Sequence, residues 1–213
     1  MPRLWTSLSL LILPFLLCHS VHASTHWQFD SDREGISVYW REHKQGLVEI
    51  RARMFTPTSY SAFLRLLEDT DNVPSWVDNV SHSEVVEQIS ANENIVYTQF
   101  KAPWPARDRD MVTYSKYWQD ELGLILHIQD APDSAVAEQA GYIRIREVDA
   151  RWTLQKINDG TTMVEYRAYA NPGGALPNWL VNKLAKSSAR KTFEGLRQQL
   201  ADYQGLTHPG INE

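Results

Sequence analysis

The sequence predicts an α+β domain in which a curved antiparallel sheet covers one long C-terminal helix. Strand patterns fill almost all of residues 80–170, and one helical pattern occupies about residues 175–203. Only one other helical pattern, at 58–69, interrupts the strands. A sheet with an apolar face needs a cover, and the long helix is the only large candidate.

The first predicted strands precede the short helix. Residues 36–40 form one strand pattern after the turn at Glu34-Gly35. In the next strand, apolar and charged residues alternate, which is typical of a half-buried strand. The apolar members are Val48, Ile50, Ala52 and Met54. Thr56-Pro57-Thr58 ends this strand and can cap the short helix. A turn is predicted at 72–76.

The middle of the chain predicts a series of antiparallel strands. Their expected ranges are 80–89, 94–101, 110–118, 124–128, 142–156 and 161–170. The Asp159-Gly160 pair between the last two is a strong hairpin signal. Residues 130–141 form the longest predicted loop.

In the C-terminal segment, the spacing of apolar residues changes from every second residue, as in strands, to a period of about 3.6 residues, as in helices. Gly173-Gly174 breaks the sheet. Apolar residues then recur at helical steps at Leu176, Leu180, Leu184, Phe193, Leu196, Leu200 and Tyr203. They predict one apolar face on a helix much longer than the average of about 11–12 residues. Residues 205–213 are expected to form a flexible tail.

Residues 1–23 predict a cleavable secretory signal peptide. Arg3 precedes a mostly apolar run from Leu4 to Leu17, and Val21-His22-Ala23 offers small residues to a signal peptidase. This run is shorter than the ~20 residues that span a bilayer. Residues 24–204 would then form the domain, without Cys18, the only cysteine. An exported chain without disulfides fits a bacterial periplasm best, with secretion as the alternative.

Composition and motifs limit the function classes. The formal net charge of −5 argues against nucleic acid as a partner. The sequence contains no phosphate loop, no nucleophile elbow and no His-x-x-x-His pattern, so we expect neither cofactor nor metal. An enzyme of the aromatase/cyclase or hydrolase type, acting on a hydrophobic substrate, stays open as an alternative, with His127, Tyr97 and Tyr166 as loose candidates for acid–base chemistry. The run Arg107 to Asp110 is expected to form structural ion pairs.

The long helix carries a local excess of basic residues. They are Lys183, Lys186, Arg190, Lys191 and Arg197. A solvated helix face is the ordinary interpretation. Transient contact with anionic lipid headgroups is the functional alternative. The chain is expected to be a monomer.

Several segments, taken in order, resemble a START domain, the StAR-related lipid-transfer family, in a bacterial exported form. They are Trp27, Glu34-Gly35-Ile36, Asn72-Val73-Pro74-Ser75-Trp76, Lys101-Ala102-Pro103-Trp104-Pro105, Arg109-Asp110, Gly141-Tyr142-Ile143-Arg144, Trp152 and Asn171-Pro172-Gly173-Gly174. The resemblance covers roughly residues 27–203. It implies a helix-grip fold with a hydrophobic tunnel that binds one lipid or similar apolar molecule, usually without catalysis. It also implies a lid made by 175–203 and the loop at 130–141.

A tunnel needs apolar walls and a few polar groups. The expected wall residues, each of which could instead pack in a solid core, are Ile50, Ala52, Met54, Leu124, Leu126, Trp152, Leu154, Val164, Tyr166, Ala168, Leu180 and Leu184. Sterol-binding members of the family often carry a buried basic residue on the strand after Arg-Asp. This chain is expected to have Ser115 there, with Tyr97 and Gln99 as wall residues on the neighbouring strand, so a sterol is not supported.

The segment Pro103-Trp104-Pro105 predicts a stiff bend between two strands, because proline lacks an N–H and restricts the preceding residue. We expect Trp104 to bury its ring there as a plug. We expect Arg109 and Asp110 to fix the start of the next strand, which makes this segment a mark of the fold rather than an active site.

Overall fold

The computed structural model describes residues 26–213, so the predicted signal peptide lies outside the described residues. Its strands are β1 (Gln28–Arg33), β2 (Ile36–Glu42), β3 (Val48–Thr56), β4 (Val80–Ser90), β5 (Glu93–Phe100), β6 (Arg109–Asp120), β7 (Gly123–Asp130), β8 (Ile143–Arg144), β9 (Arg146–Asn158) and β10 (Thr161–Asn171). Its helices are α1 (Tyr60–Glu68), α2 (Val73–Trp76) and α3 (Asn178–Gln199). Short 3-10 turns occupy Lys44–Gly46, Thr70–Asn72 and Leu200–Tyr203.

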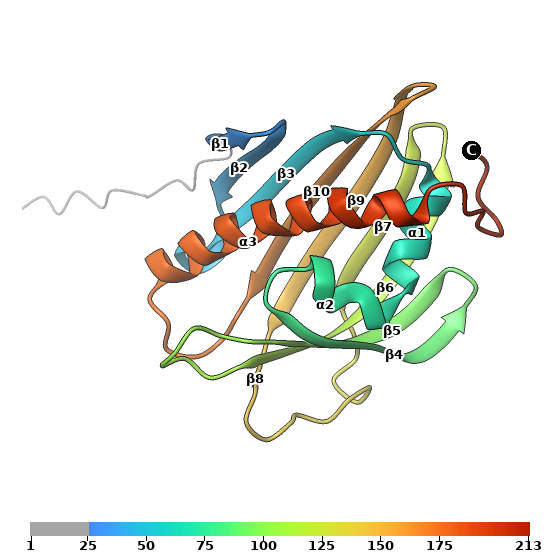
Figure 1. Ribbon diagram of the computed structural model, residues 1–213. Helices are drawn as coiled ribbons and strands as arrows, with labels where there is room; N and C mark the ends of the chain where they lie inside the picture. Colours follow the sequence, from blue (N-terminus) through green and yellow to red (C-terminus); the bar gives the residue numbers. More distant parts are fainter. Residues whose placement is uncertain (1–25) are drawn as a thin grey trace, which may run out of the picture.

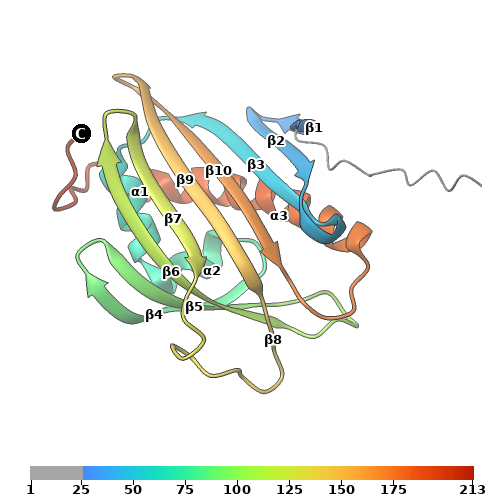
Figure 2. The same ribbon diagram turned by 180° about the vertical axis from the view of Figure 1, so that it is seen from behind.

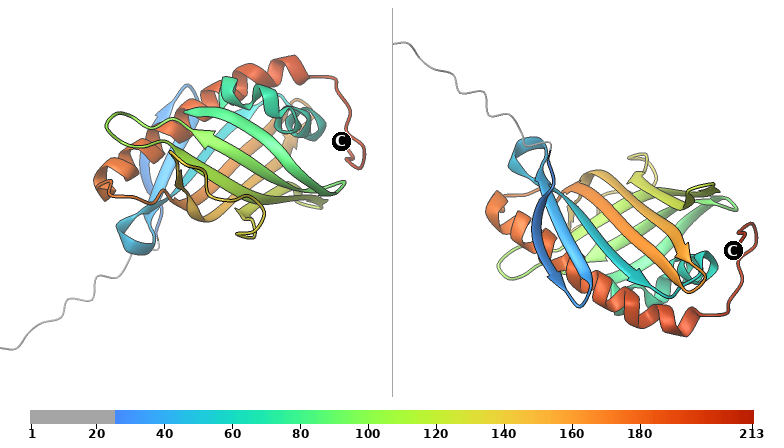
Figure 3. Two further views of the ribbon diagram at one scale, coloured as in Figure 1. Left: turned by 90° about the horizontal axis from the view of Figure 1, so that it is seen from below. Right: turned by 90° about the horizontal axis from the view of Figure 1, so that it is seen from above.

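The strands form one sheet in the order β1-β2-β3-β10-β9-β7-β6-β5-β4, and β8 pairs in parallel with β6. The sheet curves around α3, while α1 and α2 lie beside α3 on the same concave side (Figures 1, 2 and 3). The predicted curved antiparallel sheet with a long C-terminal helix is therefore confirmed. Three details differ: β1 was not expected, the turn predicted at 72–76 is mostly the short helix α2, and the strand predicted at 142–156 is divided into β8 and β9.

A solid core fills one half of the space between sheet and helices. Phe63 and Leu66 on α1, with Phe193 and Leu196 from the second half of α3, pack against the central strands. Eight of the expected wall residues belong to this core, and five of them do not reach the cavity described below: Ala52, Met54, Leu124, Leu154 and Val164. Their burial follows from the strand alternation, but bulky helix side chains fill the space in front of them.

Basic side chains of α3 hold the helix against the first hairpin. Lys186 Nζ lies 2.7 Å from Asp30 Oδ1, and Arg190 donates to the Ser31 hydroxyl at 3.3 Å. Arg197 donates to the carbonyl oxygen of Glu34 at 2.9 Å. Much of the predicted basic face is therefore used inside the fold.

The segment 205–213, expected to be flexible, instead packs against α1. His208 is buried, and its Nε2 lies 2.7 Å from Glu68 Oε1. The carboxylate of Glu213 accepts hydrogen bonds from the backbone N–H groups of Tyr60 at 3.2 Å and Ser61 at 2.8 Å. The first N–H groups of a helix lack partners within it and attract a carboxylate, which explains the docking.

The loop between β7 and β8 covers the outer, convex face of the sheet. Ala131, Ala135 and Val136 pack on a small apolar cluster of Ile95, Tyr97 and Val112. Figure 2 shows this loop on the side away from α3. The expectation that residues 130–141 form a lid over the tunnel is therefore wrong, because the loop covers apolar side chains that point away from the tunnel.

The Pro103-Trp104-Pro105 bend also differs from expectation. Trp104 is 92 % exposed, so its ring does not plug the core. The bend is instead anchored through its ends, where the Ala102 N–H donates to Asp108 at 2.9 Å. The two prolines hold the tryptophan away from the sheet because neither can donate a ladder hydrogen bond. Arg109 and Asp110 are buried at the start of β6.

Candidate functional site

A cavity of about 560 Å³ lies between the sheet and the first half of α3. This volume falls within the roughly 300–1,000 Å³ typical of small-molecule sites. Strands β3 to β7, β9 and β10 line it from the sheet side, while α1, α2 and α3 close the other side. The fold therefore contains a hollow as well as a solid core, side by side along α3.

Small side chains on α3 create the hollow. The residues of α3 that line it are Val181, Asn182, Ala185, Ser188, Ala189 and Thr192. One helical turn further on, Phe193 and Leu196 are fully buried in the solid core. A close-packed interior leaves no void where large side chains meet, so the change from small to large residues marks where the cavity ends.

Aromatic rings form the wall between cavity and core. The Trp152 ring lies between Tyr166, at a centroid distance of 4.3 Å, and Phe193, at 5.6 Å. Phe63 contacts Trp152 from α1 at 5.4 Å. Trp152 and Tyr166 also line the cavity. The rings support one another, so this wall is rigid.

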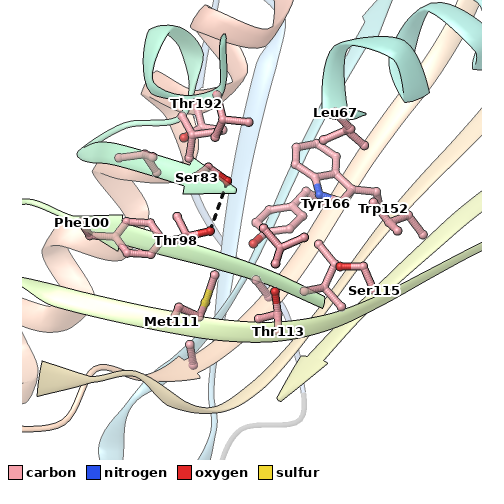
Figure 4. A pocket seen from close by; sticks show the side chains of 18 of the residues that line it. Leu67, Ser83, Thr98, Phe100, Met111, Thr113, Ser115, Trp152, Tyr166 and Thr192 are labelled. Carbon is pink, nitrogen blue, oxygen red and sulfur yellow. Dashed lines mark hydrogen bonds between the residues drawn. The ribbon is translucent and has the colours of Figure 1, made fainter. Parts of the chain in front are cut away.

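The opposite floor of the cavity carries hydroxyl groups. Ser83 on β4, Thr98 on β5 and Thr113 on β6 are buried and line the cavity. The oxygens of Ser83 and Thr98 lie 3.5 Å apart, and Ser115 continues the row on β6 (Figure 4). The cavity thus has an aromatic wall and a floor of neutral polar groups.

The structure places the expected wall residues in three groups. Five of them line the cavity: Ile50, Leu126, Trp152, Tyr166 and Ala168. A second set lies in the solid core described above. Leu180 and Leu184 are half-buried on α3 beside the stripe that faces the cavity. The sequence pattern predicts leucines at the cavity, whereas the α3 residues that line it are small or medium-sized.

The assignment of Tyr97 and Gln99 to the wall is wrong. Both lie on the outer face of β5, where Gln99 donates to the Tyr97 hydroxyl at 3.1 Å and accepts from Tyr142 at 3.0 Å. Ser115 does line the cavity, but its partner on β5 is Asn94. Alternation along β5 therefore directs Asn94, Val96 and Thr98 inward.

Of the three acid–base candidates, only Tyr166 faces the cavity. His127 points to the outer face, where its Nε2 lies 2.9 Å from Asp149. Enclosure away from bulk water raises the pKa of the Tyr166 hydroxyl to about 12, so the group stays protonated. Within residues 26–213 no cluster of three or more His, Cys, Asp or Glu side chains is placed to hold a metal.

One end of the cavity lies beside two exposed tryptophans. Phe100, Met111, Ala170 and Val181 line that end. The β5–β6 loop, which carries Trp104, and the first turn of α3, which carries Trp179, both lie at this end (Figures 1 and 3). Trp104 is 92 % exposed and Trp179 68 %.

Buried Arg109 joins these two segments. Its Nε and Nη2 donate to the carbonyl oxygens of Pro172 and Gly173, each at 3.4 Å, and its Nη1 donates to the carbonyl oxygen of Arg107. The arginine thereby ties the loop after β10 to the start of β6. The two tryptophans consequently project from a braced part of the surface.

Comparison with known proteins gives a consistent result. Human phosphatidylcholine transfer protein is 26% identical over 187 residues, which covers 85% of this chain and 86% of that protein. The crystal structure of a STAR-related lipid transfer protein from Xanthomonas axonopodis is 28% identical, with a TM-score of 0.75 over 82% of this chain and 98% of that one. Human STARD10, 21% identical, has the same fold at a TM-score of 0.75 over 85% of this chain and 75% of its own.

The START domain family matches residues 23–204, which is most of the chain. The ten-stranded sheet and the long helix reproduce the fold of the solved structures. The chain therefore belongs to the START domain family, which is known for lipid binding and transfer.

Proposed function

We propose that this protein binds one lipid or similar hydrophobic molecule in its cavity and carries it between membranes without catalysis. The observation that supports this most directly is the cavity itself, whose walls are mostly apolar and aromatic. The similarity to lipid transfer proteins agrees with it. A chemical step is not part of the proposal, because Tyr166 is the only acid–base candidate of the three that reaches the cavity.

Native mass spectrometry of the protein purified from its own host tests this function. We expect a stoichiometric adduct that mild activation releases as a lipid. Protein that is empty under gentle conditions, and that takes up nothing from a total lipid extract, would rule the proposal out. Turnover of a bound molecule that Tyr166→Phe abolishes in a folded protein would instead favour the enzyme alternative.

For delivery, we propose that the protein docks on membranes through the end that carries Trp104 and Trp179. Tryptophan prefers the interface between headgroups and acyl chains, and these two rings are exposed beside the end of the cavity. Exposed Lys101 lies on the same loop as Trp104, and exposed Lys183 lies on α3 one turn after Trp179; both suit anionic headgroups. No helix within residues 26–213 has the length and hydropathy to cross a bilayer.

A vesicle transfer assay tests the docking surface. Trp104→Ala and Trp179→Ala should each slow transfer several-fold, because less apolar surface enters the interface. Ile157→Ala is the control, since Ile157 is also exposed but lies near the β9–β10 turn, away from the tryptophans. If both tryptophan variants transfer lipid as fast as Ile157→Ala and the wild type, the proposed docking surface is wrong.

Two of the lysines of α3, Lys183 and Lys186, allow docking to be tested separately from folding. Lys183→Glu should slow transfer to anionic vesicles and leave stability unchanged, because Lys183 is exposed. Lys186→Glu should lower stability, because it places a second carboxylate beside Asp30. If Lys183→Glu has no effect and transfer does not depend on salt, the helix charge plays no part in docking.

We further propose that the protein is exported to the periplasm and acts there as a monomer. The pattern of residues 1–23 and the absence of cysteine from the rest of the chain support export. The intact mass of protein from a periplasmic fraction should lack the first 23 residues. Full-length protein confined to the cytoplasm would contradict this.

A further inference from the structure

The polar groups inside the cavity are all neutral or already paired. Within the described residues its lining contains no Lys, Arg or His. The two carboxylates at its edge have partners outside it, since Asp78 lies 3.4 Å from Lys191 and Glu68 pairs with Arg65 and His208. An anionic group inside the cavity would find no cation. Burying such a charge unpaired is costly.

Several polar groups of the cavity lining offer unused hydrogen bonds, among them Trp76 Nε1, Asn94 Oδ1 and Asn182 Oδ1. The Tyr166 hydroxyl makes no hydrogen bond within residues 26–213, and it is directed toward the side of the cavity where Thr98 and Thr113 lie (Figure 4). The Thr113 hydroxyl also lacks a partner there, although the residue is 3 % exposed. Since buried polar groups are normally paired, these hydroxyls are placed for a ligand oxygen.

The volume limits the size of the ligand. A cavity of about 560 Å³ falls within the range of sites that bury a ligand the size of a drug molecule. One long acyl or alkyl chain with a small head is a ligand of this size. A two-chain phospholipid is considerably larger.

We propose that the cavity selects an uncharged single-chain amphiphile whose hydroxyl or carbonyl oxygen binds between Tyr166 and the hydroxyls of Thr98 and Thr113. The chain of the ligand lies against Trp152 and the small residues of α3. This inference rests on the proposed function, because it names the class of lipid for the same cavity. It also separates this protein's ligand from phosphatidylcholine, which is named for one of its relatives.

Three probes test the selection: oleyl alcohol and oleate, which have one C18 chain each and different heads, and dioleoyl phosphatidylcholine, which has two such chains. The protein is incubated with each, passed through a desalting column and weighed by native mass spectrometry. At pH 8 we expect one oleyl alcohol per protein and at least about tenfold less oleate, whose charge would be buried without a partner. Retention of oleate should rise at a pH where its head is neutral.

Tyr166→Phe tests the hydroxyl site. It removes one hydrogen bond, so affinity for oleyl alcohol should fall about three- to tenfold, while affinity for 1-octadecene, which lacks the oxygen, should not change. Tyr97→Phe is the matched control, because Tyr97 lies on the outer face of the sheet. Thr113→Val should act like Tyr166→Phe and verify the effect if that variant folds poorly.

Each outcome decides a different claim. Stoichiometric dioleoyl phosphatidylcholine that is transferred between vesicles would overturn the single-chain inference and leave the proposed function standing. Equal retention of oleate and oleyl alcohol at pH 8 would overturn the neutral-head inference. No retention of any probe, together with no uptake from a lipid extract, would remove both the inference and the proposed function.

Discussion

Arg144 on β8 holds the carboxylate of Asp110 on β6 through two parallel hydrogen bonds, Nε to Oδ1 and Nη2 to Oδ2, each 2.9 Å long. The Asp110 side chain is 1 % exposed and that of Arg144 9 %. The same guanidinium donates to the carbonyl oxygens of Val136 and Ala137. One arginine thereby fastens the long outer loop to the start of β6.

Asp110→Ala should lower the free energy of unfolding by about 3–5 kcal/mol, because it leaves a buried guanidinium without its partner. Urea denaturation measures this. The double variant Asp110→Leu, Arg144→Met should recover much of the loss, since no charge then stays buried. A loss under about 1 kcal/mol for Asp110→Ala would show that the pair contributes little.

Gly195 on α3 lies directly against α2. A Cβ at this position would approach the Trp76 carbonyl oxygen to 2.6 Å and its Cα to 2.9 Å. Gly195→Ala should therefore destabilise the protein by about 1–3 kcal/mol, although alanine favours a helix by about 1 kcal/mol over glycine. Thermal unfolding measures the difference.

Gly160→Ala is the control for Gly195→Ala, because a Cβ at Gly160 meets only Asn158 Oδ1 at 3.9 Å. It should change stability little. If Gly195→Ala is as stable as the wild type, α2 can move away from α3 freely. Because Trp76 lines the cavity, Gly195→Ala should also bind ligand more weakly than the wild type.

Neighbouring serines on α3 offer a matched test of the cavity. Ser188 lines it and Ser187 does not. Ser188→Phe should displace two or three methylene groups of a ligand, each worth about 0.8 kcal/mol, and so weaken binding at least about tenfold. Ser187→Phe should bind normally. Native mass spectrometry with oleyl alcohol gives the readout, and equal binding by both variants would contradict the position of the cavity.

The contacts of Glu93 lead us to expect that the stability of the protein depends on pH. Its carboxylate accepts from the Tyr114 hydroxyl at 2.6 Å, lies 3.0 Å from Lys116 Nζ and accepts from the Ser90 hydroxyl at 2.9 Å. These contacts, of which the Tyr114 bond is the largest cause, lower the pKa of Glu93 from 4.5 to about 2. The stabilisation is therefore present above about pH 4.5 and is lost as the pH falls toward 2.

Melting temperatures of wild type and Glu93→Gln between pH 6 and pH 2 test this dependence. The wild type should be more stable at pH 6, and the difference should disappear as the pH approaches 2. Glu121→Gln, in the exposed turn between β6 and β7, should show no such convergence. A difference between wild type and Glu93→Gln that is the same at every pH would contradict the assignment.

The architecture was predictable because its signals are local and strong. The alternation of Val48 to Met54 and the hairpin at Asp159-Gly160 occur where expected. The cavity was harder to predict, because hydrophobicity indicates which side chains are buried and not where space is left among them. Leu180 and Leu184 satisfied the helical pattern, but Ala185 and Ser188 line the hollow.

The faces of β5 and β6 show a second limit. Three of their apolar members, Ile95, Tyr97 and Val112, are buried under a loop on the outside. The cavity side carries Thr98 and Thr113 together with apolar Val96, Phe100 and Met111. A sheet covered on both faces does not separate inside from outside by polarity. The loop's position is set by long-range contacts such as the one between Arg144 and Asp110, which no local pattern encodes.

The docking of Glu213 on the first turn of α1 has a practical consequence. An affinity tag placed after this residue would add bulk beside the carboxylate that the Tyr60 and Ser61 N–H groups hold. The tag could displace the Glu213 carboxylate from the first turn of α1. Because α1 borders the cavity, this would also disturb the cavity wall. Tags are better placed ahead of Trp27. Lipid exchange rates measured on C-terminally tagged protein would be those of a protein whose α1 is destabilised.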